Sequence, residues 1–306
     1  MAIPGGTLTG TSAISNLVQT AYDQYVRMAL RSIPVMRALA DVKPVQQAMP
    51  GSSVVFSIYS DLAQATSTLT ESSDVSSIAL GNPNQVTVTL QEYGSAVTTT
   101  KKLNLTSFND VDAALADIIA YNAADSIDAV VAGVLTSGTN IIYGGTATNT
   151  AGITAGSTIS VSDIRAAVTN LRSNKALPRI GELYAAYLHP KQTADLRAET
   201  GTGGFQDLSK YVDRTPFVAG AVGVLEGAFI VETPRVLSAS NGTTTVYKAI
   251  VAGREALAEA QGQDISTVIG PQIDALRRFH TIGWYYFGGW NILRAPAIYQ
   301  IQTATA

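Results

Sequence analysis

Apolar residues recur at steps of three and four along two long stretches of the chain, which is the period of an amphipathic helix. The first stretch begins at Ala13 and runs toward Pro34, which limits its far end. The second covers residues 107–136, where Ser107 and Asp110 have the spacing of a capping box. Its apolar stripe comprises Val111, Leu115, Ile118, Ile119, Val130, Val131, Val134 and Leu135. A helix of about 30 residues spans roughly 45 Å, so we predict a long strut buried along this stripe.

Three acidic residues, Asp117, Asp125 and Asp128, lie on this second predicted helix. Such a set has two interpretations, a hydrated outer face or a pair of carboxylates for acid–base catalysis. The spacing of the three residues along the helix favours the hydrated face. We therefore expect their side chains to be solvated.

Shorter patterns predict the remaining elements. Alternation of apolar and polar residues at Val86, Val88 and Leu90 is typical of a strand with one buried face. Expected strands cover residues 52–59, 85–90, 183–188, 227–232, 244–252, 274–288 and 297–302, and expected further helices cover residues 162–173 and 191–199. Helices and strands are mixed without a repeated strand–helix rhythm, which indicates an α+β fold.

A long polar segment, residues 60–84, separates the first two predicted strands and consists almost entirely of Ser, Thr, Ala, Asp, Asn and Gly. Residues 44–100 contain no Lys or Arg. A two-stranded ribbon is only marginally stable alone, and its edges can pair with another chain. We therefore expect the ribbon to lie on another molecule, with Asp61, Glu71 and Asp74 as candidate intersubunit contacts. The alternative is a mobile surface hairpin.

The first predicted helix and the residues that follow it are mildly basic, with Arg27, Arg31, Arg37 and Lys43. A solvated helix face explains this pattern. A contact with a neighbouring subunit or a packaged polyanion is the alternative, and Arg27 and Arg31 are its candidate residues.

The composition is unusual in its charge. Charged residues make up only 14% of the 306 residues, against roughly a quarter in ordinary soluble domains. Ser and Thr together number 57. A surface of small and hydroxyl-bearing residues costs less to desolvate than one of Lys and Glu. This composition suits a protein whose surface is largely covered by copies of itself.

Several classes of protein are disfavoured. The net charge of −3 provides no basic footprint for a dedicated nucleic-acid binder, and the absence of Cys excludes disulfide scaffolds and thiolate chemistry. No signal peptide is expected at the start, and no run of about 18 apolar residues suggests a membrane span. The pattern predicts a soluble protein made in a cytoplasm.

No catalytic constellation is visible either. The two histidines, His189 and His280, have no metal-ligand spacing around them, and neither a phosphate-binding loop motif nor a nucleophile elbow occurs. The Gly-rich residues 201–204 follow a predicted helix, which is the wrong context for a dinucleotide fingerprint. The aromatic cluster at 284–290 is interpreted as core. We therefore expect no enzyme, no cofactor and no metal.

Seven segments, in this order, resemble the major capsid proteins of tailed bacteriophages, which have the Hong Kong 97-like fold. The segments are STLTESSDV (67–75), QEYGSAVTTTKKL (91–103), VLTSGTNIIYGG (134–145), YLHPKQTADLRAET (187–200), GAVGVLEGAFIVETPRV (220–236), VAGREALAEA (251–260) and GWYYFGGWNILRAPAIYQIQ (283–302). Together they cover nearly the whole chain from about residue 13. No single segment is diagnostic, so the resemblance rests on their shared order.

The resemblance implies a division of the chain and a mode of assembly. The implied parts are an N-terminal arm (1–45), an extended loop (46–103), a peripheral domain with a spine helix (104–183), an axial domain (184–260) and a return to the peripheral domain (261–306). Hexamers and pentamers would form an icosahedral shell around double-stranded DNA, with weak non-specific contacts to that DNA and no membrane. Further implied partners are a portal and scaffold or decoration proteins. The protein would assemble in the host bacterial cytoplasm and reside in the virion.

The chain departs from some relatives in two respects. Only about 12 residues precede the first predicted helix, which implies a short arm and a separate scaffold or none. The extended loop has no Lys between Lys43 and Lys101, so the Lys–Asn isopeptide bond that links subunits in other relatives is not expected.

Three alternatives remain open at this stage. An encapsulin-type nanocompartment shell uses the same fold, and neighbouring portal and terminase genes would favour the phage. A glycan-binding or decoration module would explain the Ser, Thr and aromatic residues and predicts a monomer or trimer. A hydrolase with an acidic pair predicts activity that Asp→Asn changes abolish.

Overall fold

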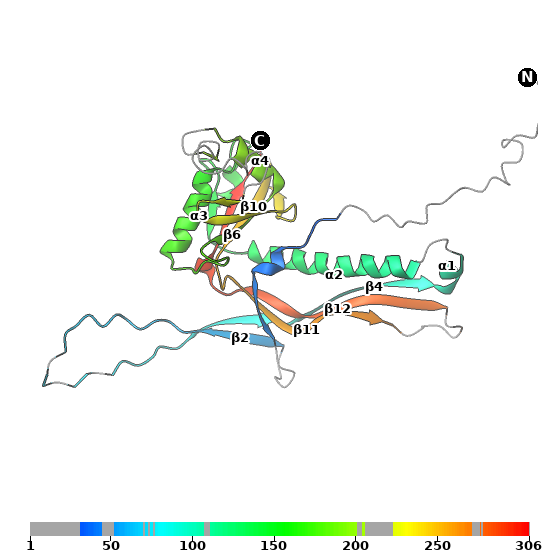
Figure 1. The fold of residues 1–306 in the computed structure, drawn as a ribbon, viewed down its shortest axis with the longest axis horizontal. Helices are drawn as coiled ribbons and strands as arrows, with labels where there is room; N and C mark the ends of the chain where they lie inside the picture. The colour runs from blue at the N-terminus through cyan, green and yellow to red at the C-terminus, as the bar shows by residue number, and fades with distance from the viewer. Residues whose placement is uncertain are drawn as a thin grey trace, which may run out of the picture.

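The computed structural model combines two sheets, a long helix and a projecting ribbon (Figure 1). It describes residues 31–44, 52–69, 71–72, 74–75, 77–106, 111–200, 204–205, 223–270, 276 and 278–305. The mixture of helix and sheet was predicted from the sequence.

The elements have the following bounds. The helices are α1 (Lys101–Thr106), α2 (Val111–Leu135), α3 (Val161–Ser173) and α4 (Pro190–Ala198), with short 3-10 turns η2 (Met36–Leu39), η3 (Thr150–Gly152) and η4 (Ala295–Ala297). The first strands are β1 (Ala40–Pro44), β2 (Ser53–Ile58), β3 (Asn84–Thr89), β4 (Gln91–Thr100), β5 (Ile141–Tyr143) and β6 (Tyr184–Leu188). The later strands are β7 (Val224–Leu225), β8 (Ala228–Glu232), β9 (Ser238–Ser240), β10 (Thr245–Ala252), β11 (Leu257–Ile269), β12 (Phe279–Ile292) and β13 (Ile298–Thr303).

Four strands form a long sheet in the order β1-β11-β12-β4. Strand β1 runs parallel to β11, whereas the other neighbours are antiparallel. Helix α2 lies along one face of this sheet (Figure 1). Its residues Ile127 and Val131 share a buried cluster with Trp284 and Tyr286 of β12. The alternating inward residues of β12 therefore supply the aromatic cover for the apolar side of the helix.

Seven strands form the second sheet, in the order β5-β13-β10-β6-β8-β7, with β9 paired to β10. Helix α3 packs on it through Ile164, Val168 and Leu171, which are buried together with Leu188 and Val251. Ser160 caps this helix, and Asp163 closes the capping box by accepting from the Ser160 backbone N–H at 2.9 Å. The cap and the apolar stripe together explain why helix forms here.

The ribbon consists of β2 and β3, paired antiparallel from Ser53 opposite Thr89 to Ile58 opposite Asn84. It projects from the end of the long sheet opposite α1 (Figure 1). Val88 is fully buried in a small cluster with Ala258 and Ala260 of β11. The base of the ribbon is therefore part of the folded body, and the strand predicted over 85–90 is confirmed as β3.

The long predicted helix is present, but its buried side differs from expectation. Helix α2 lies within the predicted range 107–136, α1 precedes that range, and the predicted cap at Ser107 and Asp110 lies outside the described residues. Ile118 is 45% exposed, whereas Ile119 is buried. The predicted apolar stripe was thus too wide, because α2 packs against the sheet on one side only.

The prediction that Asp128 is solvated was wrong. Asp128 is 1% exposed and lies at the centre of a network of polar contacts. Asp117 and Asp125 keep partly exposed side chains, both paired with arginine. The spacing of the three acidic residues showed that they lie on one helix. It could not show that Arg235 neutralises the buried Asp128 carboxylate.

The sheets also cross two of the expected divisions of the chain. Strand β13, within residues 261–306, lies in the seven-stranded sheet between β5 and β10. Elements β5 and α3, within residues 104–183, belong to this second sheet as well. The predicted helix from Ala13 lies largely outside the described residues, and residues 31–35 are not helical.

One helical segment, Leu115–Leu135, is long and apolar enough to cross a membrane by length and composition alone, although no such run was expected from the sequence. This segment packs on the four-stranded sheet, and its Asp128 pairs with Arg235. A core helix passes the same length and hydropathy criterion. The packing favours that interpretation.

Gly289 of β12 marks the point where the ribbon crosses the long sheet. A Cβ atom there would lie well inside van der Waals contact with the Thr89 carbonyl oxygen of β3. We expect Gly289→Ala to destabilise the protein by about 1–3 kcal/mol, because the backbone of β3 must move. Gly133→Ala is the control, since a Cβ on that exposed α2 position meets nothing within 4 Å. The control is expected to stabilise by about 0.5–1 kcal/mol. Urea denaturation measures the change in unfolding free energy for both variants. A change in the same direction for both would contradict the expected clash at Gly289.

Candidate assembly surfaces

The segment between β2 and β3, residues 59–83, is here called the ribbon loop. Its described residues contain no helix or strand. Six large apolar side chains on it are at least 57% exposed: Tyr59, Leu62, Leu69, Val75, Ile78 and Leu80. Soluble monomers seldom expose this much apolar surface along one segment, and such surface marks a site of interaction.

The charges of the ribbon loop are all negative. Asp61, Glu71 and Asp74, the predicted contact residues, are exposed along it. The Asp74 carboxylate also accepts a hydrogen bond from the Val75 backbone N–H at 2.8 Å. The structure thus places the three residues on the same projecting segment.

The base of the ribbon is fixed by polar as well as apolar contacts. Asn291 of β12 donates its side-chain N–H to the Thr87 carbonyl oxygen at 2.9 Å. The Lys43 ammonium lies 5.0 Å from the centre of the Phe56 ring, within range of a cation–π contact. The direction in which the ribbon leaves the body is therefore set by β1, β11 and β12 together.

A second exposed surface lies at the other end of the long sheet, beside α1 (Figure 1). We call the exposed residues on both faces of the sheet at this end, together with those of α1, the distal patch. It combines apolar side chains with two cations: Val97, Lys101, Lys102, Leu103, Leu105, Val268, Ile269 and Phe279. The Arg278 guanidinium lies 5.6 Å from the centre of the Phe279 ring. The distal patch was not predicted, because its residues come from three separate parts of the chain.

Of the two arginines predicted as intersubunit contacts, Arg31 lies within the described residues. Arg27 lies outside the described residues. Arg31 forms an ion pair with Asp117 at 2.8 Å and lies over the Tyr121 ring, 4.8 Å from its centre. Arg31 is therefore already engaged within its own chain.

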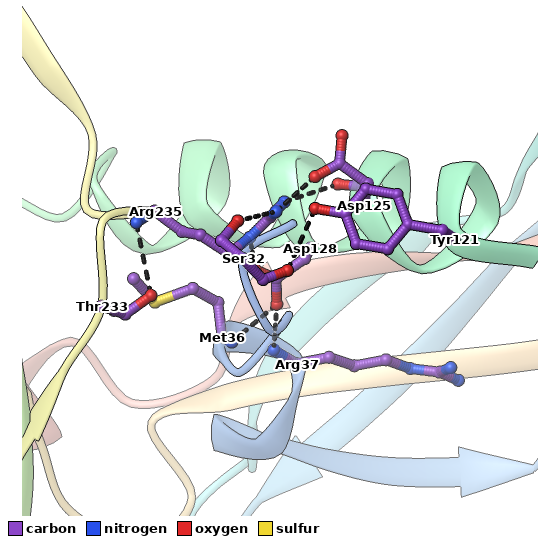
Figure 2. A network of polar contacts seen from close by, with 8 residues as sticks. All are labelled: Ser32, Met36, Arg37, Tyr121, Asp125, Asp128, Thr233 and Arg235. Atoms are coloured by element: carbon purple, nitrogen blue, oxygen red, sulfur yellow. Dashed lines mark hydrogen bonds and ion pairs between the residues drawn. The ribbon is translucent and has the colours of Figure 1, made fainter. Parts of the chain in front are cut away.

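A buried polar network holds the start of the described chain against α2 (Figure 2). The Asp128 carboxylate accepts from the backbone N–H of Met36 at 2.6 Å and of Arg37 at 3.1 Å. Its other oxygen accepts from Arg235 Nε at 2.5 Å, and Arg235 also pairs with Asp125. A buried carboxylate needs such partners, since desolvation without them is costly.

Arg37 carries the network onward to the long sheet. Its guanidinium donates to the Glu259 carboxylate at 2.6 Å, and Glu259 is completely buried. The Tyr286 hydroxyl donates to the same carboxylate at 2.9 Å. Burial, and next the Glu259 charge, raise the pKa of the Tyr286 phenol well above its usual range. This arrangement neutralises a buried glutamate and presents no reactive group.

The histidines occupy structural positions. His189 precedes α4, and its Nδ1 accepts from the Lys191 backbone N–H at 3.2 Å. Burial, with a smaller effect of Lys191, lowers the pKa of His189. His280 lies within β12, where its carbonyl oxygen accepts from the Thr99 hydroxyl at 3.4 Å. Across the part of the chain that is described, no three His, Asp or Glu side chains are grouped to hold a metal ion.

Comparison with known proteins gives a consistent result. A family described as "Phage capsid protein" matches residues 13–294. No match is found among curated proteins. Solved structures with similar folds include the capsid of cyanophage P-SCSP1u, with 17% identity, a TM-score of 0.73 and coverage of 100% of this chain and 97% of that one.

Two further similar structures come from other hosts. The head structure of Helicobacter pylori bacteriophage KHP40 has 13% identity and a TM-score of 0.73, with 100% of both chains covered. The Mycobacterium phage Che8 structure has 16% identity and a TM-score of 0.68, with 94% of this chain and 98% of that one covered. At such identities the structures show a shared fold. The family match over most of the chain goes further: this chain belongs to the phage capsid protein family.

Proposed function

We propose that this chain is the major capsid protein of a tailed phage, with the Hong Kong 97-like fold, and that it forms the icosahedral shell around double-stranded DNA as hexamers and pentamers. One observation supports this proposal most directly. In a chain of the phage capsid family, the ribbon loop exposes six large apolar side chains far from the chain's own core. A second copy of the chain is the surface that can cover them.

The two candidate surfaces are complementary in charge. The ribbon loop carries Asp61, Glu71 and Asp74, whereas the distal patch carries Lys101 and Lys102. Both also present apolar side chains. We infer that the ribbon loop of one copy lies on the distal patch and adjoining sheet of the next.

The positions of the two surfaces favour a ring. They lie at opposite ends of the long sheet (Figure 1), so each copy offers one end to each of two neighbours. A head-to-tail contact of this kind closes into a ring when its rotation permits. Each arm of the ribbon loop has about 12 residues and reaches about 40 Å when extended, which is enough to overlap a neighbouring subunit.

The parts of the fold can be assigned on this basis. In the proposed scheme α2 is the spine helix and, with the four-stranded sheet, forms the peripheral domain. The seven-stranded sheet with α3 and α4 forms the axial domain, and the ribbon is the extended loop. This scheme moves β5, α3 and β13 to the axial domain, because they belong to the second sheet.

The partners and location follow from the same proposal. A portal, scaffold or decoration proteins and weakly bound DNA complete the proposed particle, which assembles in the host cytoplasm. No covalent link through a loop lysine is proposed, since residues 44–100 have none. The role is structural and requires no catalysis.

Electron microscopy of the purified protein tests the proposal. Closed, uniform particles are expected, together with rings of five and six subunits on partial disassembly. A stable monomer under all conditions of salt and concentration would contradict it. Co-expression with neighbouring genes separates a phage shell from an enzyme-loaded nanocompartment, because only the phage shell should incorporate a portal.

Neutralising the ribbon loop tests the proposed contact. We expect D61N/E71Q/D74N to weaken assembly, because exposed ion pairs contribute about 0.2–1 kcal/mol each and the contact repeats around every ring. The critical concentration for particle formation, measured by light scattering, should rise about tenfold for a loss of about 1.4 kcal/mol. Glu182→Gln, an exposed change outside both surfaces, is the control.

A charge-swapped chain gives the decisive comparison. Reversal of the three loop acids to Lys should prevent assembly, and adding K101E/K102E to the same chain should restore it in part. If the swap restores nothing while both chains remain folded, the distal patch is not the partner of the ribbon loop.

A further inference from the structure

The parts of the chain built on the two sheets, here called the two halves, meet at a junction that is only partly filled. Ala185 and Ile250 of the seven-stranded half share a buried cluster with Trp284 and Tyr286 of the four-stranded half. Beside this core lies a cleft of about 530 Å³, lined by Ile58, Val86, Lys175, Leu177, Arg294 and Pro296 among others. Open space at the junction leaves room for one half to turn against the other.

A short segment crosses this junction. Residues 32–41, here called the strap, are held from the seven-stranded half by two arginines. Arg235, from the turn after β8, donates to the Ser32 hydroxyl at 3.1 Å (Figure 2). Arg179, between α3 and β6, donates to the Ala38 carbonyl oxygen at 2.9 Å and pairs with Asp41 at 3.3 Å.

The other half holds the same segment by different contacts. Asp128 of α2 accepts the backbone N–H groups of Met36 and Arg37, and Glu259 of β11 pairs with the Arg37 side chain. Asp41 also accepts from the Glu255 backbone N–H at 2.8 Å, just before β11 begins. The strap is thus bonded to both halves along a length of ten residues.

We propose that the strap is a latch that fixes the angle between the two halves and thereby the curvature of the assembled shell. The inference rests on the proposed function above. In a head-to-tail ring, the rotation from one copy to the next depends on how the contacting surfaces of a copy are oriented. A copy used in both five- and six-membered rings needs an angle that changes within narrow limits. Hydrogen bonds and ion pairs that span a hinge limit its rotation, because packed interfaces switch between discrete arrangements and do not deform continuously.

Arg179 is the residue at which the latch can be tested without leaving a buried charge unpaired. The side chains of Arg179 and Asp41 are 17% and 38% exposed, so water can solvate Asp41 when its partner is removed. Arg179→Ala removes one of the two arginines that hold the strap from the seven-stranded half and leaves the Asp128 network intact, including the Arg235 contact to Ser32. Arg165→Ala is the matched control, because Arg165 pairs with Glu226 at 2.9 Å within the seven-stranded half alone.

The experiment compares particle diameters by electron microscopy for the wild type, R179A, R179K and R165A. We expect R179A to give a broad or shifted distribution of diameters, R179K an intermediate one, and R165A the wild-type distribution. Wild-type diameters for a folded R179A would overturn the latch while leaving the proposed function in place. If R179A does not fold, R179K decides the question by the same measurement. Failure of the wild type to form particles would instead overturn the proposed function, and the latch with it.

Discussion

Replacing Asp128 with alanine is expected to cost the protein about 3–5 kcal/mol of folding stability, the range for removing one partner of a buried ion pair. The change leaves the buried Arg235 guanidinium with Asp125 alone as its carboxylate partner and removes the acceptor for two backbone N–H groups. We therefore expect a large loss of soluble protein. The measurement is the midpoint of urea denaturation, together with the soluble fraction after expression.

Asp117→Ala provides a matched control on the same helix. Asp117 pairs with Arg31, but its side chain is 57% exposed, so we expect a loss below about 1 kcal/mol. Asp128→Asn should fall between the two, because the amide oxygen can still accept from both backbone N–H groups while the charge that pairs with Arg235 is lost. Equal denaturation midpoints for D128A and D117A would show that the network does not hold the strap.

Deleting residues 62–82 is expected to abolish shell assembly while the subunit stays folded. The deletion leaves a loop of four residues between β2 and β3, a length found in natural hairpins. It removes five of the six exposed apolar side chains, Tyr59 being the exception, and two of the three loop acids. The midpoint of thermal unfolding should change by only a few degrees, because the buried clusters contain no residue of the deleted segment.

A chain in which the same 21 residues are replaced by Gly and Ser tests whether length alone matters. It should also fail to assemble, because it restores the reach of the loop and not its apolar or acidic side chains. Normal shells from either chain would refute the proposed role of the ribbon loop. A large loss of stability in the deletant would mean that the loop folds onto its own subunit.

Local patterns predicted the elements whose burial follows a simple period. Strand β3 alternates along Val86 and Val88, and α3 has both a cap and an apolar stripe. Strand β11 was not predicted, because Gln261, Gly262 and Gln263 interrupt its pattern. The structure shows register shifts against β12 at this place. An irregular strand of this kind is stabilised by its neighbour, which the pattern of a single segment does not contain.

The candidate surfaces likewise divide into those that a single segment of sequence predicts and those that depend on contacts between distant segments. The ribbon loop could be predicted, since low charge and length without apolar periodicity are properties of one continuous segment. The buried state of Asp128 could not, because its partner Arg235 lies 107 positions away in the sequence. The distal patch likewise combines residues from β4, α1, β11 and β12. Features that depend on contacts between distant segments require the fold.

The absence of Lys and Arg from residues 44–100 has a practical consequence for following the ribbon loop in solution. Trypsin cuts after basic residues, so it leaves the whole loop intact whether the subunit is free or assembled. A protease that cuts after large apolar residues meets exposed sites at Tyr59, Leu62 and Leu69. Chymotrypsin should therefore cleave this segment quickly in free subunits and slowly in shells. The rate of cleavage then reports the fraction of ribbon loops that are covered by a neighbouring subunit.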